Sequence, residues 1–177
     1  KEEVAGANLI CFSVMTMQIP KALELSGLVK KINPSCKVIW GGAHPTFFPE
    51  QTVSSRLIDV VVFGEGEYTI GDLAQGKKLA EIKGIAYLQG CVVIKNAEQR
   101  PFEPVEEALF NWDLEPKEIL ENLNLIPSLT SRGCPHRCTF CVNAILKNKW
   151  RPRTVEQVLE DLRLINSKPY FKNKNLR

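Results

Sequence analysis

Three cysteines within eight residues are the part of this sequence most clearly suited to chemistry. The run Cys134-Pro-His-Arg-Cys138-Thr-Phe-Cys141 places three thiols in one short loop, separated by three and then by two residues. Three thiolates can bind three irons of a four-iron cluster and leave the fourth iron without a protein ligand. An open coordination position is what a metal needs if a substrate or cofactor is to bind it. The spacing therefore predicts a reactive iron–sulfur site with Cys134, Cys138 and Cys141 as the metal ligands.

A structural zinc site is the alternative interpretation of the same loop. His136 can complete a tetrahedral set with the three cysteines, since zinc accepts both thiolate and imidazole ligands. However, His136 lies between two of the ligands, where strain hinders simultaneous binding, and zinc modules normally draw their ligands from two separate knuckles. The other cysteines, Cys11, Cys36 and Cys91, sit singly in apolar stretches, so we expect them to be buried small hydrophobic residues. This uneven distribution indicates a metal site in a reducing compartment rather than a disulfide framework.

Three short apolar segments, each followed by a helical pattern, precede the cysteine loop. The predicted strands span residues 8–14, 37–40 and 58–63, and the predicted helices span 21–31, 49–56 and 68–74. Apolar strands that alternate with helices are typical of a parallel sheet covered on both faces. The sequence therefore predicts a doubly wound α/β fold for this part of the chain.

The loops that follow the three predicted strands are candidate ligand-binding loops. Doubly wound sheets bind ligands outside the carboxyl ends of their strands, which here lead into residues 13–16, 41–46 and 64–67. Glycine in these loops lets the backbone approach a ligand closely, although each glycine is equally suited to a simple turn. The candidate cofactor-binding residues are Ser13, Thr16, Gly41, Gly42, Gly64, Glu65 and Gly66.

After residue 76 the alternation of apolar strands and helices gives way to a different arrangement. Residues 82–88 and 91–95 flank Gln89-Gly90, which predicts a β-hairpin. Prolines and acidic residues in the following stretch indicate an extended connection with a short helix at 116–123.

A strand at 125–130 is predicted to lead into the cysteine loop, and Thr154 is predicted to cap a helix that reaches residue 165. One such β–loop–α unit cannot enclose a core of its own, so we interpret it as the start of a larger barrel-type domain. The expected organisation is an α/β domain at 1–76, a hairpin at 77–97, a linker at 98–123 and the barrel-type segment at 124–177.

Composition limits the other possible classes of protein. With 177 residues, 44% hydrophobic and 24% charged, the chain is typical of a soluble globular protein. It contains no apolar run long enough for a membrane span and no secretion signal, so we expect a cytoplasmic protein. The net charge of +3 is too small to argue for a nucleic-acid partner. From Lys147 onward, basic residues outnumber acidic ones by nine to three, which fits solvated surface positions or an RNA-binding arm.

The stretch Thr130-Ser-Arg-Gly-Cys-Pro-His-Arg-Cys-Thr-Phe-Cys141 resembles the opening strand and cluster loop of the radical S-adenosylmethionine (SAM) superfamily. The resemblance implies a 4Fe–4S cluster on the three cysteines, with SAM chelating the free iron through its amino and carboxylate groups. It also implies reductive cleavage of SAM to a 5′-deoxyadenosyl radical by an electron from the cluster. Phe140, the aromatic residue before the last cysteine, would lie near the adenine.

Residues 8–76 resemble the later strands of the Rossmann-like cobalamin-binding domain that precedes the radical SAM domain in one large subgroup. Trp40-Gly-Gly-Ala-His-Pro-Thr46, Asp59-Val-Val-Val-Phe-Gly-Glu-Gly-Glu67 and Lys83-Gly-Ile-Ala-Tyr87 carry this likeness. In the subgroup, the positions of Ser13 and Gly41-Gly42 line the corrin and the nucleotide tail of cobalamin. The resemblance thus implies a partial TIM-type radical SAM barrel after a cobalamin domain.

Two features of the subgroup have no counterpart in this sequence. The Asp-x-His-x-x-Gly motif is missing, so the lower axial ligand of cobalamin stays open, and His44, which lies in a different loop, is not assigned to that role. The later SAM-binding strands of the barrel are missing too, so we expect that this chain alone does not complete the reaction.

The resemblance implies a radical SAM enzyme that uses cobalamin to transfer a methyl group to an unactivated centre of a small-molecule substrate. An electron donor of the flavodoxin or ferredoxin type is the implied partner. The alternatives are an oxidative cyclase or rearrangement enzyme, as in tetrapyrrole cyclisation, and a non-enzymatic α/β binding module stabilised by zinc. A methylthiotransferase is a poorer match because Cys11, Cys36 and Cys91 do not resemble its additional cluster ligands.

Overall fold

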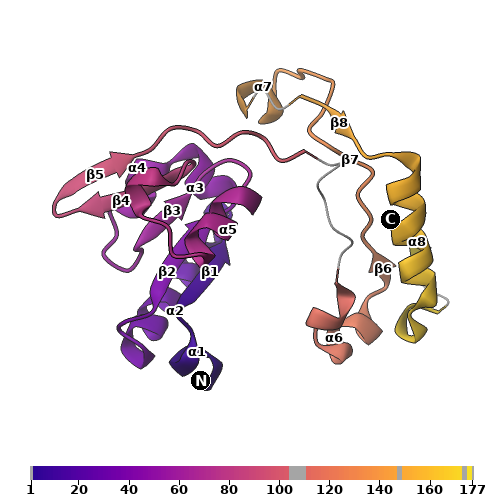
Figure 1. The fold of residues 1–177 in the computed structure, drawn as a ribbon, viewed down its shortest axis with the longest axis horizontal. Coiled ribbons are helices and arrows are strands. Elements are labelled where there is room, and N and C mark those ends of the chain that lie inside the picture. Colours follow the sequence, from indigo (N-terminus) through magenta and orange to yellow (C-terminus); the bar gives the residue numbers. More distant parts are fainter. Residues whose placement is uncertain (1, 104–110, 147–148, 173–174, 177) are drawn as a thin grey trace. The chain divides into compact units, whose positions relative to one another are not determined.

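The chain forms two compact units in the computed structural model, Lys1–Phe102 and Glu103–Arg177 (Figure 1). The structure describes residues 2–103, 111–146, 149–172 and 175–176. Each unit has its own hydrophobic core, and each is described separately below.

A five-stranded sheet in the order β1-β2-β3-β4-β5 forms the centre of the first unit. Its first three strands, β1 (Leu9–Ser13), β2 (Lys37–Gly41) and β3 (Val60–Val62), pair in parallel. The other two, β4 (Ile85–Gln89) and β5 (Val92–Lys95), form an antiparallel hairpin, and β4 pairs antiparallel with β3. The predicted hairpin is present, but its turn is Gly90-Cys91 rather than Gln89-Gly90, because Gln89 pairs with Val92. It extends the sheet beyond its parallel part.

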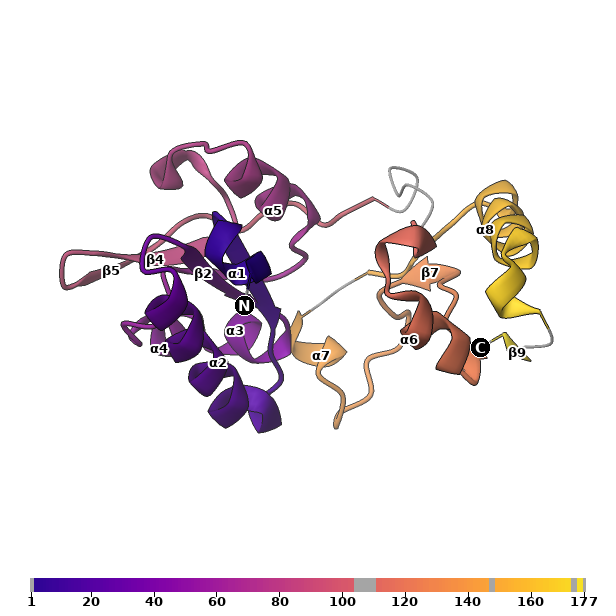
Figure 2. The same ribbon diagram turned by 90° about the horizontal axis from the view of Figure 1, so that it is seen from below.

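Helices cover both faces of this sheet. They are α1 (Glu2–Gly6), α2 (Ile19–Ile32), α3 (Ala43–Phe47), α4 (Pro49–Val53) and α5 (Glu67–Ala74), with the short 3-10 turns η1 (Thr16–Gln18) and η2 (Leu79–Glu81). Figure 2 shows α5 on one side of the sheet and α2 and α4 on the other. Side chains that alternate along a strand enter two separate cores: Val38 and Trp40 face α2 and α4, while Ile39 packs with Leu73 of α5. The doubly wound α/β fold predicted for this region is confirmed.

Two polar contacts fix α2 against the sheet. The indole Nε1 of Trp40 donates a hydrogen bond to the buried hydroxyl of Ser26 over 3.0 Å. The Lys30 ammonium lies 2.5 Å from the carboxylate of Asp59, and that carboxylate also accepts from the backbone N–H of Val38 over 2.6 Å. The first contact satisfies the buried indole N–H and hydroxyl, which would otherwise lack partners, and the second is only partly buried.

The second unit has shorter elements around a smaller core. They are η4 (Trp112–Leu114), α6 (Lys117–Asn122), β6 (Leu125–Ile126), β7 (Ser131–Arg132), α7 (Asn143–Leu146), β8 (Arg151–Pro152), α8 (Val155–Ser167), η5 (Pro169–Phe171) and β9 (Asn175–Leu176). The core consists of Trp112, Leu120, Ile126, Ile165 and Phe171. Strand β6 pairs in parallel with β9, and β7 pairs antiparallel with β8. The chain therefore runs from β6 through the cysteine loop and α8 to a parallel strand, which is a β–α–β arrangement.

The structure corrects two expectations about these segments. The strand predicted at 125–130 is confined to Leu125–Ile126, since Pro127 has no N–H with which to continue a ladder. Cys36 is fully buried as expected, but Cys11 and Cys91 are exposed. Cys91 follows Gly90 in the hairpin turn, where it has no core to enter. Although Cys11 is exposed overall, partial desolvation raises the pKa of its thiol, and the neighbouring Cys36 adds to this effect.

Candidate functional site

The loops that follow β1 and β2 are packed directly against each other at the carboxyl end of the sheet. The register places Ser13 beside Gly41, and the N–H of Val14 donates to the Gly41 carbonyl over 2.8 Å. A Cβ atom on Gly42 would lie 2.9 Å from Ser13 Oγ and 2.7 Å from Val14 N. The structure therefore brings together Ser13, Gly41 and Gly42, three of the predicted cofactor-binding residues.

Thr16 lies at the same sheet edge through a contact with α3. Its hydroxyl shares a 3.2 Å hydrogen bond with Nδ1 of His44, whose backbone N–H donates to Val14 O over 3.0 Å. His44 is buried, with 8% of its surface exposed. The histidine therefore has a structural role in holding the first two loops together.

The loop after β3 joins this arrangement through Thr46. The Thr46 hydroxyl donates to the Gly42 carbonyl over 2.8 Å and accepts from the Gly64 N–H over 3.1 Å. Gly64 has a φ of 79°, and a Cβ atom there would have nothing within 4 Å, so its backbone is open to a ligand. Gly66 is the N-cap of α5, and the Glu65 carboxylate accepts from the Phe102 N–H over 2.6 Å. The loops after β1, β2 and β3 are thus joined by hydrogen bonds at the carboxyl end of the sheet.

Large apolar side chains are exposed in the loops of this edge. Their exposure was not predicted from the sequence. Met15 is 63% exposed, Met17 is 94% exposed and Phe48, at the end of α3, is 50% exposed. Exposed methionines adapt their shape to an apolar ligand. The signal available in the sequence was two methionines that flank Thr16 in a loop after a buried strand.

The cysteine loop lies entirely in the second unit, directly after β7. Cys134 and Cys141 are partly buried and Cys138 is exposed. The N–H of Cys141 donates to the Cys138 carbonyl over 3.0 Å, which closes a turn between the last two thiols. Among the described residues, no three His, Cys, Asp or Glu side chains are gathered as a metal site. Phe140, in the same loop, is 91% exposed.

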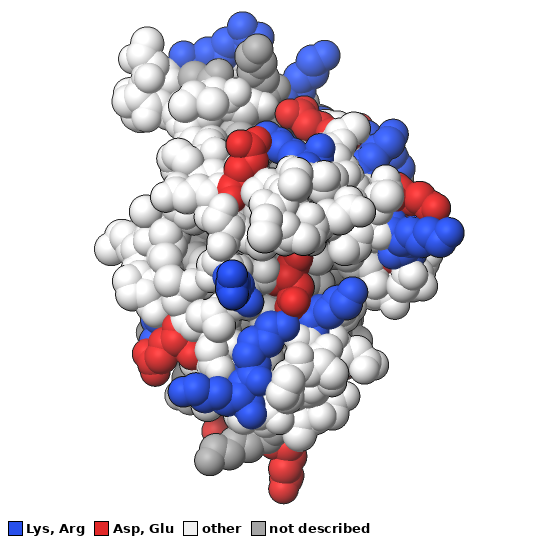
Figure 3. Space-filling model, turned by 90° about the vertical axis from the view of Figure 1, so that its left-hand side faces the viewer, with Lys and Arg blue, Asp and Glu red and all other residues white. Residues whose placement is uncertain are grey.

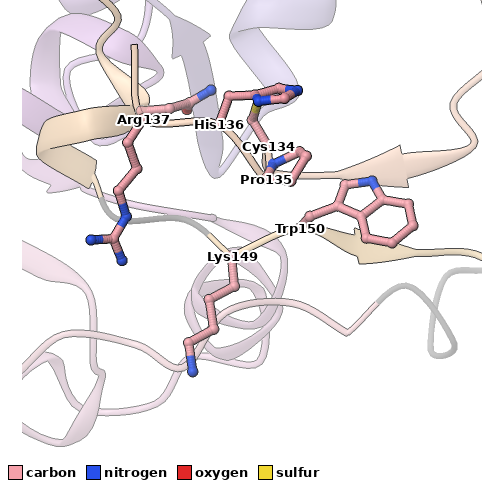
Figure 4. Close-up of a pocket in the computed structure, with 7 residues that line it drawn as sticks. Cys134, Pro135, His136, Arg137, Lys149 and Trp150 are labelled. Carbon is pink, nitrogen blue, oxygen red and sulfur yellow. The ribbon is translucent and has the colours of Figure 1, made fainter. Parts of the chain in front are cut away.

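A cavity of about 280 Å³ opens beside Cys134. Its walls are formed by Cys134, Pro135, His136, Arg137, Asn143, Lys149 and Trp150, which Figure 4 draws as sticks. The pairing of Arg132 in β7 with Arg151 in β8 accounts for its shape, because it brings the residues just after β7 opposite those just before β8. This cavity could not be predicted from the sequence, since the spacing of the cysteines carries no information about the returning strand β8.

The base of the cysteine loop is anchored by Arg153. Its backbone N–H donates to the Thr130 carbonyl and its guanidinium to the Leu129 carbonyl, each over 3.0 Å. The same guanidinium forms an almost fully buried ion pair with Asp161 of α8. Thr154 caps α8 as predicted, which fixes the helix that follows the loop.

Charged residues on the face shown in Figure 3 are mixed in sign, with lysine and arginine interspersed among acidic and uncharged residues. In the part of the chain that the structure describes, no helix is long and apolar enough to cross a membrane.

Comparisons with known proteins agree with this architecture. Residues 2–74 match the family model of the B12 binding domain. An uncharacterized methyltransferase of Pyrococcus horikoshii is 33% identical over 169 residues, which cover 90% of this chain and 37% of that protein. The anaerobic magnesium-protoporphyrin IX monomethyl ester cyclase of Rubrivivax gelatinosus is 30% identical over 180 residues, which cover 93% of this chain and 31% of the cyclase.

A solved structure of a cobalamin-dependent enzyme also matches this chain. The cobalamin-dependent SAM radical enzyme OxsB, with aqua-cobalamin and SAM bound, superimposes with a TM-score of 0.72 at 27% identity. The match covers 97% of this chain and 25% of OxsB. This chain thus spans about a third of the length of the two curated relatives.

The parallel strands β1, β2 and β3 lie in the part of the chain that matches the B12 binding domain, and the cysteine loop lies in the second compact unit. The matches make the chain similar to cobalamin-binding radical SAM enzymes, the family that its motifs resemble, and its residues 2–74 match the B12 binding domain.

Proposed function

We propose that this chain holds a 4Fe–4S cluster and cobalamin for a radical SAM enzyme that transfers a methyl group to an unactivated centre of a small molecule. The observation that carries the proposal is the loop of three free thiols that directly follows the short strand β7, in a chain whose residues 2–74 match a B12 binding domain. When bound, the cluster supplies the electron for SAM cleavage and cobalamin supplies a carrier for the methyl group.

The donor set of the second unit fits the cluster. Cys134, Cys138 and Cys141 offer three thiols on one accessible loop, and Phe140 extends from that loop with 91% of its surface exposed. We assign the three cysteines to the irons and Phe140 to the adenine of SAM. The Arg153 contacts and the capped helix α8 hold the two ends of the loop in place.

The strand-end edge of the first unit fits cobalamin, a large ligand with an apolar face. Gly64 leaves its backbone open, and Met15, Met17 and Phe48 offer exposed apolar surface in the loops after β1 and β2. We assign Ser13, Thr16, Gly41, Gly42, Gly64, Glu65 and Gly66 to the cobalamin-binding edge. Hydrogen bonds among the three loops keep this edge in one arrangement before a ligand arrives.

Oxidative cyclisation is the second candidate reaction, because a relative that is 30% identical over 93% of this chain is a cyclase. The substrate in either case is a small molecule, and we expect an electron donor of the flavodoxin or ferredoxin type. Six free cysteines fit a reducing, cytoplasmic environment.

Anaerobic reconstitution with iron and sulfide tests the metal assignment. We expect about four irons per chain and a broad absorption at about 400 nm. Cys138→Ser should abolish both, whereas Cys91→Ser, which changes an exposed cysteine in the hairpin turn, should leave both unchanged. Tight zinc binding without iron uptake, unaffected by Cys138→Ser, would establish the zinc module instead.

Titration with hydroxocobalamin tests the cobalamin edge. Met17→Glu adds a charge to a side chain that is 94% exposed, so it should weaken binding without affecting folding. Val92→Glu changes a 61% exposed side chain in the hairpin and serves as the matched control. Binding that is absent, or equally weakened by both variants, would contradict the assignment.

A further inference from the structure

The segment that follows β5 returns to α5 and the loop after β3. Residues 96–102, here called the strap, run beside Gly84, whose N–H donates to the Ala97 carbonyl over 2.8 Å. A Cβ atom on Gly84 would lie 3.1 Å from Gln99 Cβ, so the strap is closely packed at this point. Residues 98–102 belong to the stretch predicted as a linker, yet they form part of the first compact unit.

Three contacts fix the end of the strap on this part of the fold. The Phe102 N–H donates to the Glu65 carboxylate over 2.6 Å, which is a hydrogen bond to a charged acceptor. The ring centroids of Phe102 and of Tyr68, near the start of α5, are 5.0 Å apart. The Arg100 guanidinium lies over the Tyr68 ring, 4.0 Å from its centroid. Aromatic pairs and cation–π contacts at such distances are attractive, so all three contacts favour this position of the strap.

Glu65 stands between Gly64 and Gly66, the two glycines of this loop that are assigned to the candidate cobalamin edge. The Gly64 N–H donates to the Thr46 hydroxyl over 3.1 Å. The Gly66 carbonyl accepts from the Ile70 N–H of α5 over 2.7 Å. Glycine imposes little conformational preference of its own, so the loop keeps its shape through such contacts with its surroundings. The hydrogen bond between Glu65 and the strap is one of them.

We propose that the strap positions the loop after β3 for cobalamin, with Glu65 and Phe102 as positioning residues whose side chains bind the protein rather than the ligand. The identity of the ligand rests on the function proposed above, but the hold of the strap on the loop requires no ligand. Closure of the strap and binding at the loop are then coupled, and each favours the other by the same factor. Since Phe102 is the last residue of the first unit, bound cobalamin restrains the start of the connection to the cysteine-bearing unit.

Hydrogen exchange of the reduced, cofactor-free chain tests the hold of the strap on the loop. Phe102→Ala removes the ring that contacts Tyr68 and leaves the backbone N–H in place. We expect the amides of residue 102, Gly64 and Ile70 to exchange at least about fivefold faster, since local opening of the loop exposes them to water. Ser26→Ala is the matched control, because it loses a buried contact of the same unit and alters no contact of the strap. It should leave the exchange of these three amides unchanged.

Titration with hydroxocobalamin tests the coupling. Phe102→Ala should weaken binding at least about fivefold, the lower limit of typical coupling between two sites, and Ser26→Ala should leave the affinity unchanged. In the wild type, saturating hydroxocobalamin should slow exchange of the Phe102 amide. Circular dichroism of each variant verifies its fold. Arg100→Gln removes the cation–π contact of an exposed residue, should weaken binding in the same direction, and takes the place of Phe102→Ala in each comparison if that variant does not fold.

Unchanged exchange of the loop amides in Phe102→Ala, or an equal effect of Ser26→Ala, would overturn the proposal. Equal affinity of the wild type and Phe102→Ala for hydroxocobalamin would overturn the positioning role and leave the cobalamin assignment in place. Faster loop exchange in Phe102→Ala, together with no hydroxocobalamin binding by the wild type, would overturn the cobalamin assignment and leave the hold of the strap on the loop established.

Discussion

Gly42 has a backbone conformation that is nearly exclusive to glycine, and the candidate cobalamin edge depends on it. Its φ of 95° and ψ of −166° lie in a region that side chains avoid, and a Cβ atom would also be 2.7 Å from Val14 N. The sequence indicated a glycine turn or a ligand approach at this position. The structure shows a third cause, the close contact between two loops of the protein itself.

Gly42→Ala should lower the free energy of unfolding by at least about 1–3 kcal/mol, because backbone strain and the contact with the β1 loop both oppose it. Gly71→Ala is the matched control, since a Cβ atom in the middle of α5 meets nothing within 4 Å. Alanine there should be neutral or stabilising by up to about 1 kcal/mol. Urea unfolding measures both changes, and equal effects of the two variants would show that Gly42 is not constrained.

Ser26→Ala should cost about 1–3 kcal/mol, because it leaves the buried N–H of Trp40 without its acceptor. Ser54→Ala is the control, since the Ser54 hydroxyl bonds to the Glu50 carbonyl on an exposed surface. That change should remain within about 0.5 kcal/mol. Urea unfolding followed by circular dichroism compares the two, and a Ser26→Ala effect no larger than the control would count against this contact.

At the scale of elements, local patterns predicted most of the first unit. The apolar runs that contain Val38 and Val61 identified two parallel strands, because both faces of those strands are covered. The hairpin was predicted from Gln89-Gly90, but its pairing with β3 was not, since the choice of partner strand is a long-range contact without a local signal. The additional helix α3 was missed because Pro45 lies inside it.

The second unit was harder to predict at this scale. Its strands are two residues long, and β9 pairs with β6 about fifty positions earlier in the sequence. The cysteine spacing identified candidate metal ligands without any knowledge of these strands. It could not give the relative positions of the sulfurs, because the metal organises such ligands as it binds.

Helix α8 depends on a reciprocal cap at its first turn. The Thr154 hydroxyl accepts from the Gln157 N–H over 3.2 Å, and the Gln157 side chain accepts from the Thr154 N–H over 2.9 Å. Thr154→Ala should therefore destabilise the protein by about 1 kcal/mol and speed hydrogen exchange of the Gln157 amide. Thr154→Asp retains an acceptor and should restore protection. Unchanged exchange in Thr154→Ala would show that the cap contributes nothing.

At the scale of the whole molecule, contacts between distant parts of the sequence determine how stability responds to pH. Asp113 follows the first residue of η4, whereas Lys168 and Tyr170 lie beyond α8, more than fifty residues later. The Lys168 ammonium is 2.5 Å from the Asp113 carboxylate, and the Tyr170 hydroxyl is 3.2 Å from it. The hydrogen bond from Lys168 lowers the pKa of Asp113, and the same contact raises the pKa of Lys168.

The direction of each pKa shift gives the pH range over which this contact stabilises the fold. The lowered pKa of Asp113 means that its contribution is complete above the unfolded value of about 4 and is lost as the pH falls through the lower folded value. The raised pKa of Lys168 means that its contribution is complete below about 10.4 and is lost as the pH rises through the higher folded value. Desolvation raises the pKa of Tyr170, so its hydroxyl stays protonated across the same range.

Asp113→Asn should therefore lower the melting temperature throughout the range from about pH 5 to pH 9, and the difference from the wild type should shrink below about pH 4. All three side chains are accessible to water, so added salt should reduce the difference as well. Glu115→Gln removes a nearby exposed carboxylate of the same segment and should show no such pH-dependent difference. A constant difference between Asp113→Asn and the wild type down to pH values well below about 4 would mean that the lost stability comes from packing and not from the ionised carboxylate.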